Sequence, residues 1–431
     1  MVWFWYVKST LVLTMRTEEL GNLLKDEVEQ RREEGCSVEG FKEKVEEAIR
    51  SGNAQRLYAL YEELSSLSPE PSFPFVEPSD LFGIRRESSP QSLKLWKISE
   101  AELSDRISGA WLGRCAGCLL GKPFEGWSKE KIELNLKASN SYPLEKYELH
   151  RSIRGMVRDD DIDYTILGLH ILESKGFGFT THDVAEEWLN HMPYGLVYTA
   201  ERAAYRNLVN GLQAPETATY LNPYREWIGA QIRADIWGYV TPGRPEMGAE
   251  LAYRDARLSH VKNGIYGEMF VAAALSVALV SEDIELPIRI ALSTIPSRSR
   301  LAECVRDALA WKARYRRWEE AWEEAMMKYG AYHPVHTINN LAFVLIGLLY
   351  GEKDFEKTIT RSVMCGFDTD CNGATSGSIV GALLGAKRLP SKWIEPLNDY
   401  VESAVTGFAE NRISDLADRT ISLASGIGTK T

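Results

Sequence analysis

The chain has 431 residues, of which 44% are hydrophobic and 26% are charged, so it can bury one sizeable core and carry an appendage. The formal net charge of −11 argues against a nucleic-acid partner bound through its phosphates, because no basic stripe offsets it. The six cysteines lack the dense, even spacing of a secreted disulfide scaffold, so we expect a cytoplasmic protein.

The chain opens on an apolar run from Met1 to Met15, which is too short to cross a bilayer. The run carries Lys8 in its middle and lacks the basic lead-in and the small-residue cleavage site of a secretory signal. A membrane-surface anchor is one interpretation. The other is a translation start at Met15, because residues 16–20 read as the opening of a helix. We expect a soluble protein with no membrane partner.

Residues 1–67 are predicted to form a small helical extension. Two helical stretches lie between residues 16 and 67, with breaks at Gly35 and at 51–53. Residues 68–97 are rich in proline and serine, which predicts an extended linker. The extension would then be a separate unit, and the sequence leaves open whether it contacts proteins or dimerises.

Residues 98–431 are predicted to form the main domain, which reads as helical nearly throughout. Its amphipathic segments are 185–191, 198–209, 268–281, 300–328, 338–350, 355–364 and 394–408. No strand–helix alternation, phosphate loop or dinucleotide fingerprint interrupts them, so we expect an all-α fold. The segment 220–267 is irregular and rich in Gly, Pro, Asn and aromatic residues, and we expect it on the substrate side of the site.

Two stripes of glycines recur at every fourth position. They are Gly109, Gly113, Gly117 and Gly121, and later Gly373, Gly377, Gly381 and Gly385. Each glycine inside a helix costs about 1 kcal/mol against alanine, so eight of them need a reason. We expect the two helices to cross with their backbones in close contact. The first stripe also holds Cys115 and Cys118, which we interpret as close packing rather than as a zinc or redox pair.

Two acidic runs stand beside predicted helices. One is Asp159–Asp161, before the apolar run 166–172, and the other is Asp368 with Asp370 at the start of the second glycine stripe. If the five carboxylates meet, protons or cations must relieve their repulsion. Ligation by oxygen alone favours Mg²⁺, Mn²⁺ or Ca²⁺ over zinc, and five carboxylates suit two ions. The alternative for each run is helix capping.

These motifs, taken in chain order, resemble the ADP-ribosylglycohydrolase family over about residues 105–424. The matching pieces are residues 109–113, 120–125 and 159–165, the segment around His260, residues 366–374 and residues 413–417. The resemblance implies a compact orthogonal multi-helix bundle as the catalytic domain, with two Mg²⁺ ions. It also implies cleavage of a glycosidic bond, often N-glycosidic, at the anomeric carbon of a ribosyl small molecule or of an ADP-ribosylated protein.

The resemblance assigns roles to residues by position. Metal ligands would be Asp160, Asp161, Asp368 and Asp370, joined by Asp159. Either Asp370 or Asp161 would activate water, and Glu125 would lie near the scissile bond or the leaving group. The residues implied in substrate binding are Glu125, Gln231, Arg233, His260, Asn263, Gly264 and Tyr266. From the residues alone, His260 before a glycine-rich turn reads as well as a structural histidine.

The chain departs from the family pattern in three places. Asp159 and Ile162 stand where the family has threonines, and Cys371 replaces another threonine, which weakens one metal site or favours Mn²⁺. The family's diphosphate loop is replaced by residues 227–238, although Arg233 is kept. Besides the glycohydrolase, two hypotheses stay open: a non-catalytic ligand-binding or structural descendant, and a metal phosphohydrolase. The leaving group and the oligomeric state are also left open.

Overall fold

The computed structural model describes residues 15–89, 98–148 and 153–427. Over these ranges the regular secondary structure is helical apart from four two-residue strands, which confirms the all-α prediction. Within the same ranges, no helix combines the length and the apolar character needed to cross a bilayer. The apolar run before Met15, residues 90–97 of the linker and the last four residues lie outside the described ranges, so the interpretations of the N-terminal run stay predictions.

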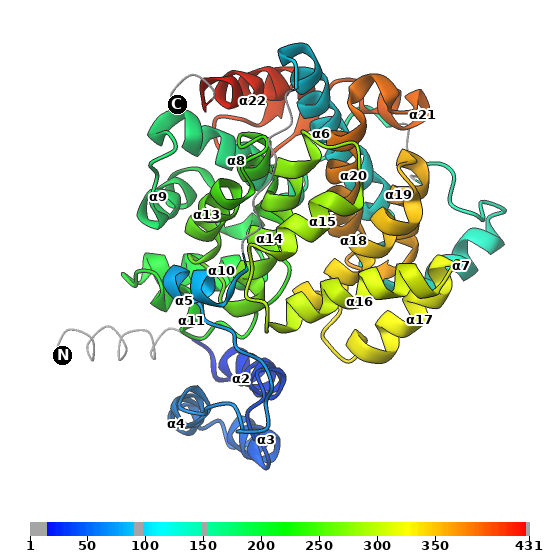
Figure 1. The fold of residues 1–431 in the computed structure, drawn as a ribbon. Helices are drawn as coiled ribbons and strands as arrows, with labels where there is room; N and C mark the ends of the chain where they lie inside the picture. The colour runs from blue at the N-terminus through cyan, green and yellow to red at the C-terminus, as the bar shows by residue number, and fades with distance from the viewer. Residues whose placement is uncertain (1–14, 90–97, 149–152, 428–431) are drawn as a thin grey trace.

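Residues 17–65 form an N-terminal unit of three helices. They are α2 (Thr17–Glu33), α3 (Phe41–Arg50) and α4 (Ala54–Ser65). The sequence predicted two helical stretches here. The predicted breaks at Gly35 and at 51–53 are the ones that separate the three helices, and Gly40, with a left-handed φ of 74°, directly precedes α3. In Figure 1 the unit stands at one end of the bundle. Its apolar core also takes in Tyr220 and Leu221, so it is docked on the main domain.

The predicted linker lies against the main domain. Pro78 accepts a hydrogen bond from the Tyr266 hydroxyl, and Glu77 pairs with Arg300 at 2.7 Å. Instead of staying extended throughout, the segment then forms α5 (Leu81–Glu87), whose first turn is capped by Asp80. Contacts with neighbouring helices therefore fix the path of this segment.

The main domain packs its helices around one large core. Its α-helices are α6 (Glu100–Gly121), α7 (Lys129–Ala138), α8 (Asp160–Lys175), α9 (Thr181–His191), α10 (Thr199–Val209), α11 (Glu216–Thr219), α12 (Asp235–Tyr239), α13 (Pro245–Ala256), α14 (Lys262–Ala278), α15 (Glu285–Leu292), α16 (Arg300–Arg314), α17 (Trp318–Tyr329), α18 (Thr337–Gly351), α19 (Phe355–Met364), α20 (Thr369–Leu384), α21 (Ser391–Ile394) and α22 (Ile413–Ile427). The short 3-10 turns are η1 (Lys122–Phe124), η2 (Tyr194–Leu196), η3 (Gln231–Arg233), η4 (Ala386–Arg388) and η5 (Glu395–Leu397). The strands are β1 (Trp127–Ser128), β2 (Gly366–Phe367), β3 (Val401–Glu402) and β4 (Glu410–Asn411), paired antiparallel as β1–β2 and β3–β4.

Three predicted segments differ from the structure. The segment 300–328 is two helices, α16 and α17, and 394–408 is no helix but contains η5 and β3. The segment 220–267, predicted as irregular, contains α12 and the 12-residue α13. Pro245 opens α13 at a position where its missing N–H is not needed.

The two glycine helices cross as predicted. A Cβ built on Gly113 would lie 2.1 Å from the carbonyl oxygen of Gly377, and one built on Gly377 would lie 2.2 Å from that of Gly113. Gly109 pairs with Gly381 and Gly117 with Gly373 in the same reciprocal way. Helices α6 and α20 therefore run antiparallel with no side chain between them, and Figure 1 shows them side by side in the bundle.

This crossing brings the end of α6 to the start of α20. The Thr369 hydroxyl donates to the carbonyl of Gly121 at 2.8 Å. Just beyond, β1 pairs with β2, and the Gly126 amide donates to the Phe367 carbonyl at 2.8 Å. The turn that carries Glu125 is thus held beside the segment that leads into Asp368.

Candidate metal centre

The two acidic runs meet in the structure. Carboxylate oxygens of Asp159 and Asp161 and the Sγ of Cys118 lie within 4.8 Å of one another, and the same holds for Asp161, Asp370 and Cys371. All five residues are buried, and Asp161 belongs to both groups. Asp159 caps α8, since its side chain accepts from the Asp161 amide at 3.1 Å. Asp159 therefore both caps α8 and takes part in the cluster of carboxylates.

Asp368 and Glu125 complete what we call the acidic centre: Asp159, Asp161, Asp368 and Asp370, with Glu125 at its rim. Asp368 is 7% exposed and Asp370 is 4% exposed. Glu125 stays exposed, yet it lies within hydrogen-bonding reach of Asp370. Its pKa is raised, by partial burial first and then by the charges of Asp368 and Asp159.

Burial and mutual repulsion disfavour full ionisation of the acidic centre. Burial raises the pKa of Asp161 and of Asp370 well above the usual aspartate range, and the charge of Asp159 raises both pKa values further. The pKa of Asp368 is raised mainly by burial. Cations between these oxygens would relieve the repulsion, so the donor set fits divalent ions.

Asp160 is a member of neither group. Its side chain is half-buried. Burial raises its pKa, and the charges that act on it most are those of Asp159, Arg158 and Asp163, all in its own run. Asp163 is itself occupied, because it accepts from Arg158 at 2.8 Å and from the Ala404 amide at 2.9 Å.

A buried arginine under the acidic centre was missed by the sequence analysis. The Arg114 Nε donates to the Asp161 carbonyl at 3.0 Å, and its Nη1 donates to Asp235 at 2.6 Å. Asp235 also accepts from the hydroxyls of Tyr239 and Ser378. The aspartate in the replaced diphosphate loop is therefore the counter-ion of Arg114. An arginine inside a helix of small residues was the available signal.

Lys122 and Cys118 were also missed as members of the centre. Lys122 forms an ion pair with Asp159, which raises the pKa of the ammonium group. The Cys118 Sγ lies 3.9 Å from an Asp161 oxygen. Burial, followed by the neighbouring carboxylates, raises the pKa of Cys118 and of Cys371, so both thiols are neutral next to the aspartates.

Arg233 is already neutralised by the protein. It is fully buried and pairs with Glu201 at 2.6 Å and with Asp255 at 2.7 Å. Gln231, two residues earlier in η3, is different. It is fully buried, and neither its side-chain oxygen nor its nitrogen has a hydrogen-bond partner among the described residues. Of the two loop residues predicted to bind substrate, only Gln231 has free polar atoms.

The other predicted substrate-binding residues make contacts within the chain. Asn263 donates to Glu226 at 2.7 Å and to Glu77 at 2.8 Å, and the Tyr266 hydroxyl donates to Pro78. The buried His260 shares a hydrogen bond between its Nδ1 and the Ser259 hydroxyl at 2.8 Å. At Gly264, a Cβ would lie 2.7 Å from the Arg225 carbonyl oxygen. Asn263 and Tyr266 thus bind the linker segment.

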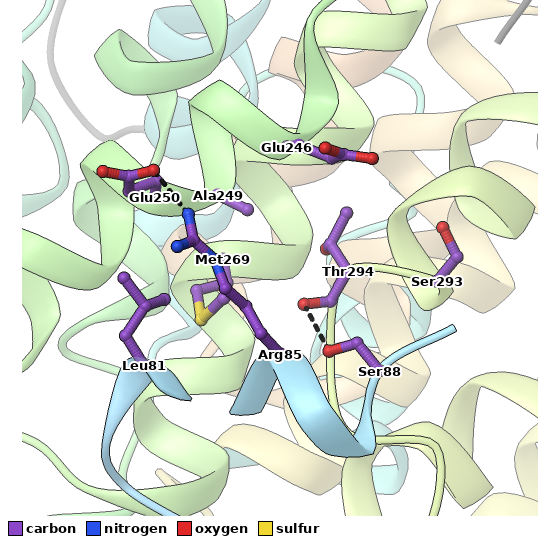
Figure 2. Close-up of a pocket in the computed structure, with 9 residues that line it drawn as sticks. All are labelled: Leu81, Arg85, Ser88, Glu246, Ala249, Glu250, Met269, Ser293 and Thr294. Carbon is purple, nitrogen blue, oxygen red and sulfur yellow. Dashed lines mark hydrogen bonds and ion pairs between the residues drawn. The ribbon is translucent and has the colours of Figure 1, made fainter. Parts of the chain in front are cut away.

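Two cavities lie elsewhere in the described chain. One of about 200 Å³ is lined by α5, α13, Met269 and residues 293–294; Figure 2 shows Arg85 paired with Glu250 at its edge. The other, of about 180 Å³, lies between α2 and the segments that carry Trp227 and His333. Neither is lined by a residue of the acidic centre.

The fold and the site define an all-helical protein with a buried carboxylate centre between two helix N-termini. The family model described as ADP-ribosylglycohydrolase matches residues 99–428, so the chain belongs to the ADP-ribosylglycohydrolase family. A solved structure titled "ADP-ribosylglycohydrolase-related protein complex" is similar at 20% identity and a TM-score of 0.50, over 75% of this chain and 99% of that one. No curated protein matches the chain.

Proposed function

We propose that this protein is a metal-dependent glycohydrolase. Its reaction is cleavage of the glycosidic bond, most simply N-glycosidic, at the anomeric carbon of an ADP-ribosyl or related ribosyl group on a small molecule or a protein. The observation that carries the proposal is the convergence of Asp161 and Asp370, from two distant runs, on one buried centre. Membership of the ADP-ribosylglycohydrolase family supports the reaction class.

The residues that would hold the metal are Asp159, Asp161, Asp368 and Asp370, with Asp160 added by the family resemblance. The crowding of Asp161 and Asp370, whose pKa values are raised by burial and by the charge of Asp159, and the all-carboxylate ligands suit Mg²⁺, with Mn²⁺ as the alternative that tolerates the nearby neutral thiols. Divalent ions bound there would supply Lewis acidity toward ribose hydroxyls and water. Lys122 already neutralises part of the charge at Asp159.

Asp370 is the better candidate for the base that accepts the proton of the attacking water. The Nη2 of Arg114 lies 3.4 Å from the carboxylate of Asp161. A neighbouring cation lowers the basicity of a carboxylate, so Asp161 is the weaker base. Asp370 instead lies beside Glu125 at the rim. Carboxylate charge around the sugar would stabilise an oxocarbenium-like transition state.

Glu125 is suited to deliver a proton to the leaving group. It is exposed, so a substrate can reach it, and its raised pKa keeps it protonated to higher pH than an ordinary glutamate. Gln231 offers unsatisfied amide atoms that could bind a ribosyl substrate. Arg233 is already paired with carboxylates, so a substrate without a diphosphate is compatible with this loop.

The test is product analysis by mass spectrometry after incubation with ADP-ribosyl-arginine and Mg²⁺. Controls are EDTA, Asp370→Ala and the surface variant Asp418→Ala. Metal-dependent release of ADP-ribose by the wild type and Asp418→Ala, but not by Asp370→Ala, is the expected result. If that substrate is untouched, simple ribosides come next. A folded, metal-binding protein inert toward all of them would favour the non-catalytic descendant.

A further inference from the structure

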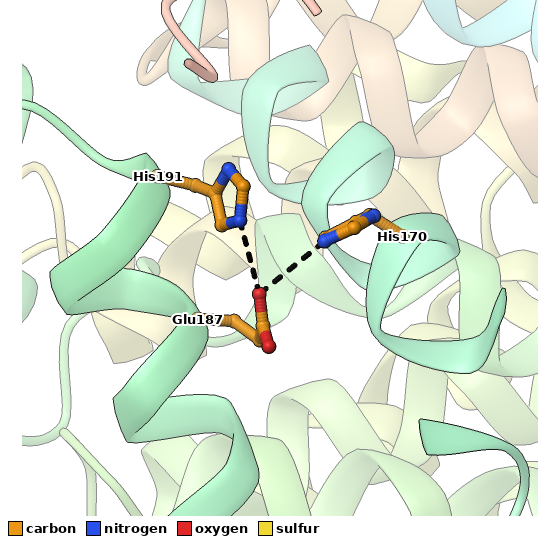
Figure 3. A group of neighbouring side chains, drawn as sticks. All are labelled: His170, Glu187 and His191. Carbon is orange, nitrogen blue, oxygen red and sulfur yellow. Dashed lines mark ion pairs between the residues drawn. The ribbon is translucent and has the colours of Figure 1, made fainter. Parts of the chain in front are cut away.

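A second group of metal-ligating side chains lies away from the acidic centre. His170 comes from α8, while Glu187 and His191 lie one helical turn apart on α9. Figure 3 shows both imidazole rings directed at the same carboxylate oxygen. The Glu187 Oε2 is 3.3 Å from the His170 Nε2 and 3.2 Å from the His191 Nε2.

The hydrogen bonding of His191 places a donor at the other ring nitrogen. Its Nδ1 lies 2.9 Å from the Thr406 carbonyl oxygen. A carbonyl only accepts, so the Nδ1 carries a proton. With the proton on Nδ1, the Nε2 is left to face the Glu187 carboxylate, and a metal ion bound between the two atoms would be ligated by both. Histidines that bind metals commonly make this second hydrogen bond to a carbonyl.

The spacing of the three ligand atoms suits a tetrahedral ion. Bond lengths of about 2.0–2.1 Å at tetrahedral angles separate two ligand atoms by about 3.3 Å. The observed separations are 3.2 and 3.3 Å, and all three atoms lie within 4.8 Å of one another. Donor–acceptor distances in N–H···O hydrogen bonds extend to about 3.2 Å, and the two observed N···O distances equal or exceed that limit.

The surroundings favour a cation and leave it room to enter. The other Glu187 oxygen faces the Lys175 ammonium at 3.5 Å, and that lysine also lies 3.4 Å from Glu186 and 3.9 Å from Asp183. Three carboxylates thus outnumber the single lysine. The histidine side chains are 22% and 24% exposed, so solvent reaches the group and a water can fill a fourth position.

We propose that His170, Glu187 and His191 bind a divalent transition-metal ion, with Zn²⁺ as the representative case. Two imidazoles and one carboxylate suit zinc and its neighbours in the transition series rather than Mg²⁺, so this site differs in chemistry from the acidic centre. The ion would join α8 to α9. Through Thr406 it would also hold the connection between β3 and β4. The proposal does not depend on the glycohydrolase assignment.

The first experiment uses untagged, metal-stripped wild-type protein in excess Mg²⁺. Cu²⁺ is added as a probe and its electron paramagnetic resonance spectrum is recorded. We expect nitrogen superhyperfine coupling from the imidazoles of His170 and His191. The acidic centre contains no histidine and would not supply this coupling. A spectrum without nitrogen coupling would overturn the proposal, and this measurement needs no variant that might fail to fold.

The second experiment is Zn²⁺ titration calorimetry on the wild type, His170→Gln and His191→Gln. The matched control is His182→Gln, which lies on α9 with a side chain 72% exposed. We expect Zn²⁺ affinity to fall at least about 10-fold in the first two variants and to be unchanged in the control. Zn²⁺ should also raise the Tm of the wild type and of the control, but not the Tm of His170→Gln or His191→Gln. Equal affinities in all four proteins would refute the site.

Discussion

The backbones of Gly117 and Gly373 touch. A Cβ on Gly117 would lie 1.9 Å from the Gly373 carbonyl oxygen, and one on Gly373 would lie 2.3 Å from that of Gly117. The next residue on α6 is Cys118, and Asp370 lies less than one turn before Gly373 on α20. This contact between two glycines therefore sets how closely α6 and the acidic centre approach each other.

Replacement of Gly117 by alanine is expected to destabilise the whole domain. The new methyl group would push the two backbones apart, and neither backbone can rotate out of the way as a side chain could. We expect a loss of about 3 kcal/mol or more, the upper part of the range for overpacking. Urea denaturation measures the loss. Gly178→Ala is the control, since its Cβ would meet nothing within 4 Å. Equal stability of the two variants would mean that the helices separate without penalty.

Glu125→Gln should lower kcat by about 10²–10⁴-fold and leave KM nearly unchanged, because an amide cannot deliver the proton that the leaving group takes. In the wild type, kcat should also fall as the pH rises through the raised pKa of Glu125, since the protonated form is the active one. The variant should lack that limb of the pH profile. Steady-state kinetics on a cleaved substrate, with the exposed Glu130→Gln as control, checks both points. An unaltered kcat would remove Glu125 from the mechanism.

Arg225→Met should loosen the N-terminal unit. The buried Arg225 guanidinium binds Glu27, on α2, at 2.6 Å and Glu34, the C-cap residue of α2, at 3.0 Å. Removal of one partner of a buried ion pair typically destabilises by about 3–5 kcal/mol. Limited proteolysis should then cut sooner between residues 68 and 80. The control, Arg32→Ala, breaks an exposed pair with Glu29 and should shift stability by less than about 1 kcal/mol. Identical cleavage rates would show that apolar contacts alone hold the unit.

Glu33→Gln should change how stability depends on pH. Burial, followed by the charge of Glu226, raises the pKa of Glu33 from 4.5 to about 7. Between these two pH values the carboxyl of Glu33 is ionised in the unfolded chain and still protonated in the folded chain. Deprotonation therefore favours the unfolded chain, and Glu33 lowers the free energy of unfolding as the pH rises from 4.5 to 7. The loss is on the order of 3 kcal/mol.

The difference between wild type and Glu33→Gln isolates this effect. His336 faces Glu33 at 3.7 Å, and burial lowers its pKa to about 3, which acts in the opposite direction between pH 3 and 6.5. Since both proteins contain His336, its contribution cancels to first order. Denaturation curves at several pH values should show the variant gaining stability over the wild type up to pH 7. A constant difference across that range would mean that Glu33 ionises as it does in water.

Local patterns predicted much of the fold. The segment 355–364 is α19 with the predicted bounds, and the two glycine stripes cross as expected, because a four-residue repeat places its members on one helix face whatever lies around it. The prediction of a helix at 394–408 was wrong, because the apolar spacing of this segment also suits a turn and a strand that pack on the core. Helix α13 was not predicted, because the prolines of the segment 220–267, Pro245 among them, made it read as irregular.

The sequence by itself determined that the chain is helical, that two glycine helices pack backbone to backbone, and that aspartates stand at the starts of α8 and α20. These features follow from spacing along single helices. Only the tertiary structure decided that Arg114 neutralises Asp235, that Arg233 is neutralised inside the protein, and that His170 meets His191. Each of these contacts joins separate elements, and the packing of whole helices sets which side chains face each other across such a gap.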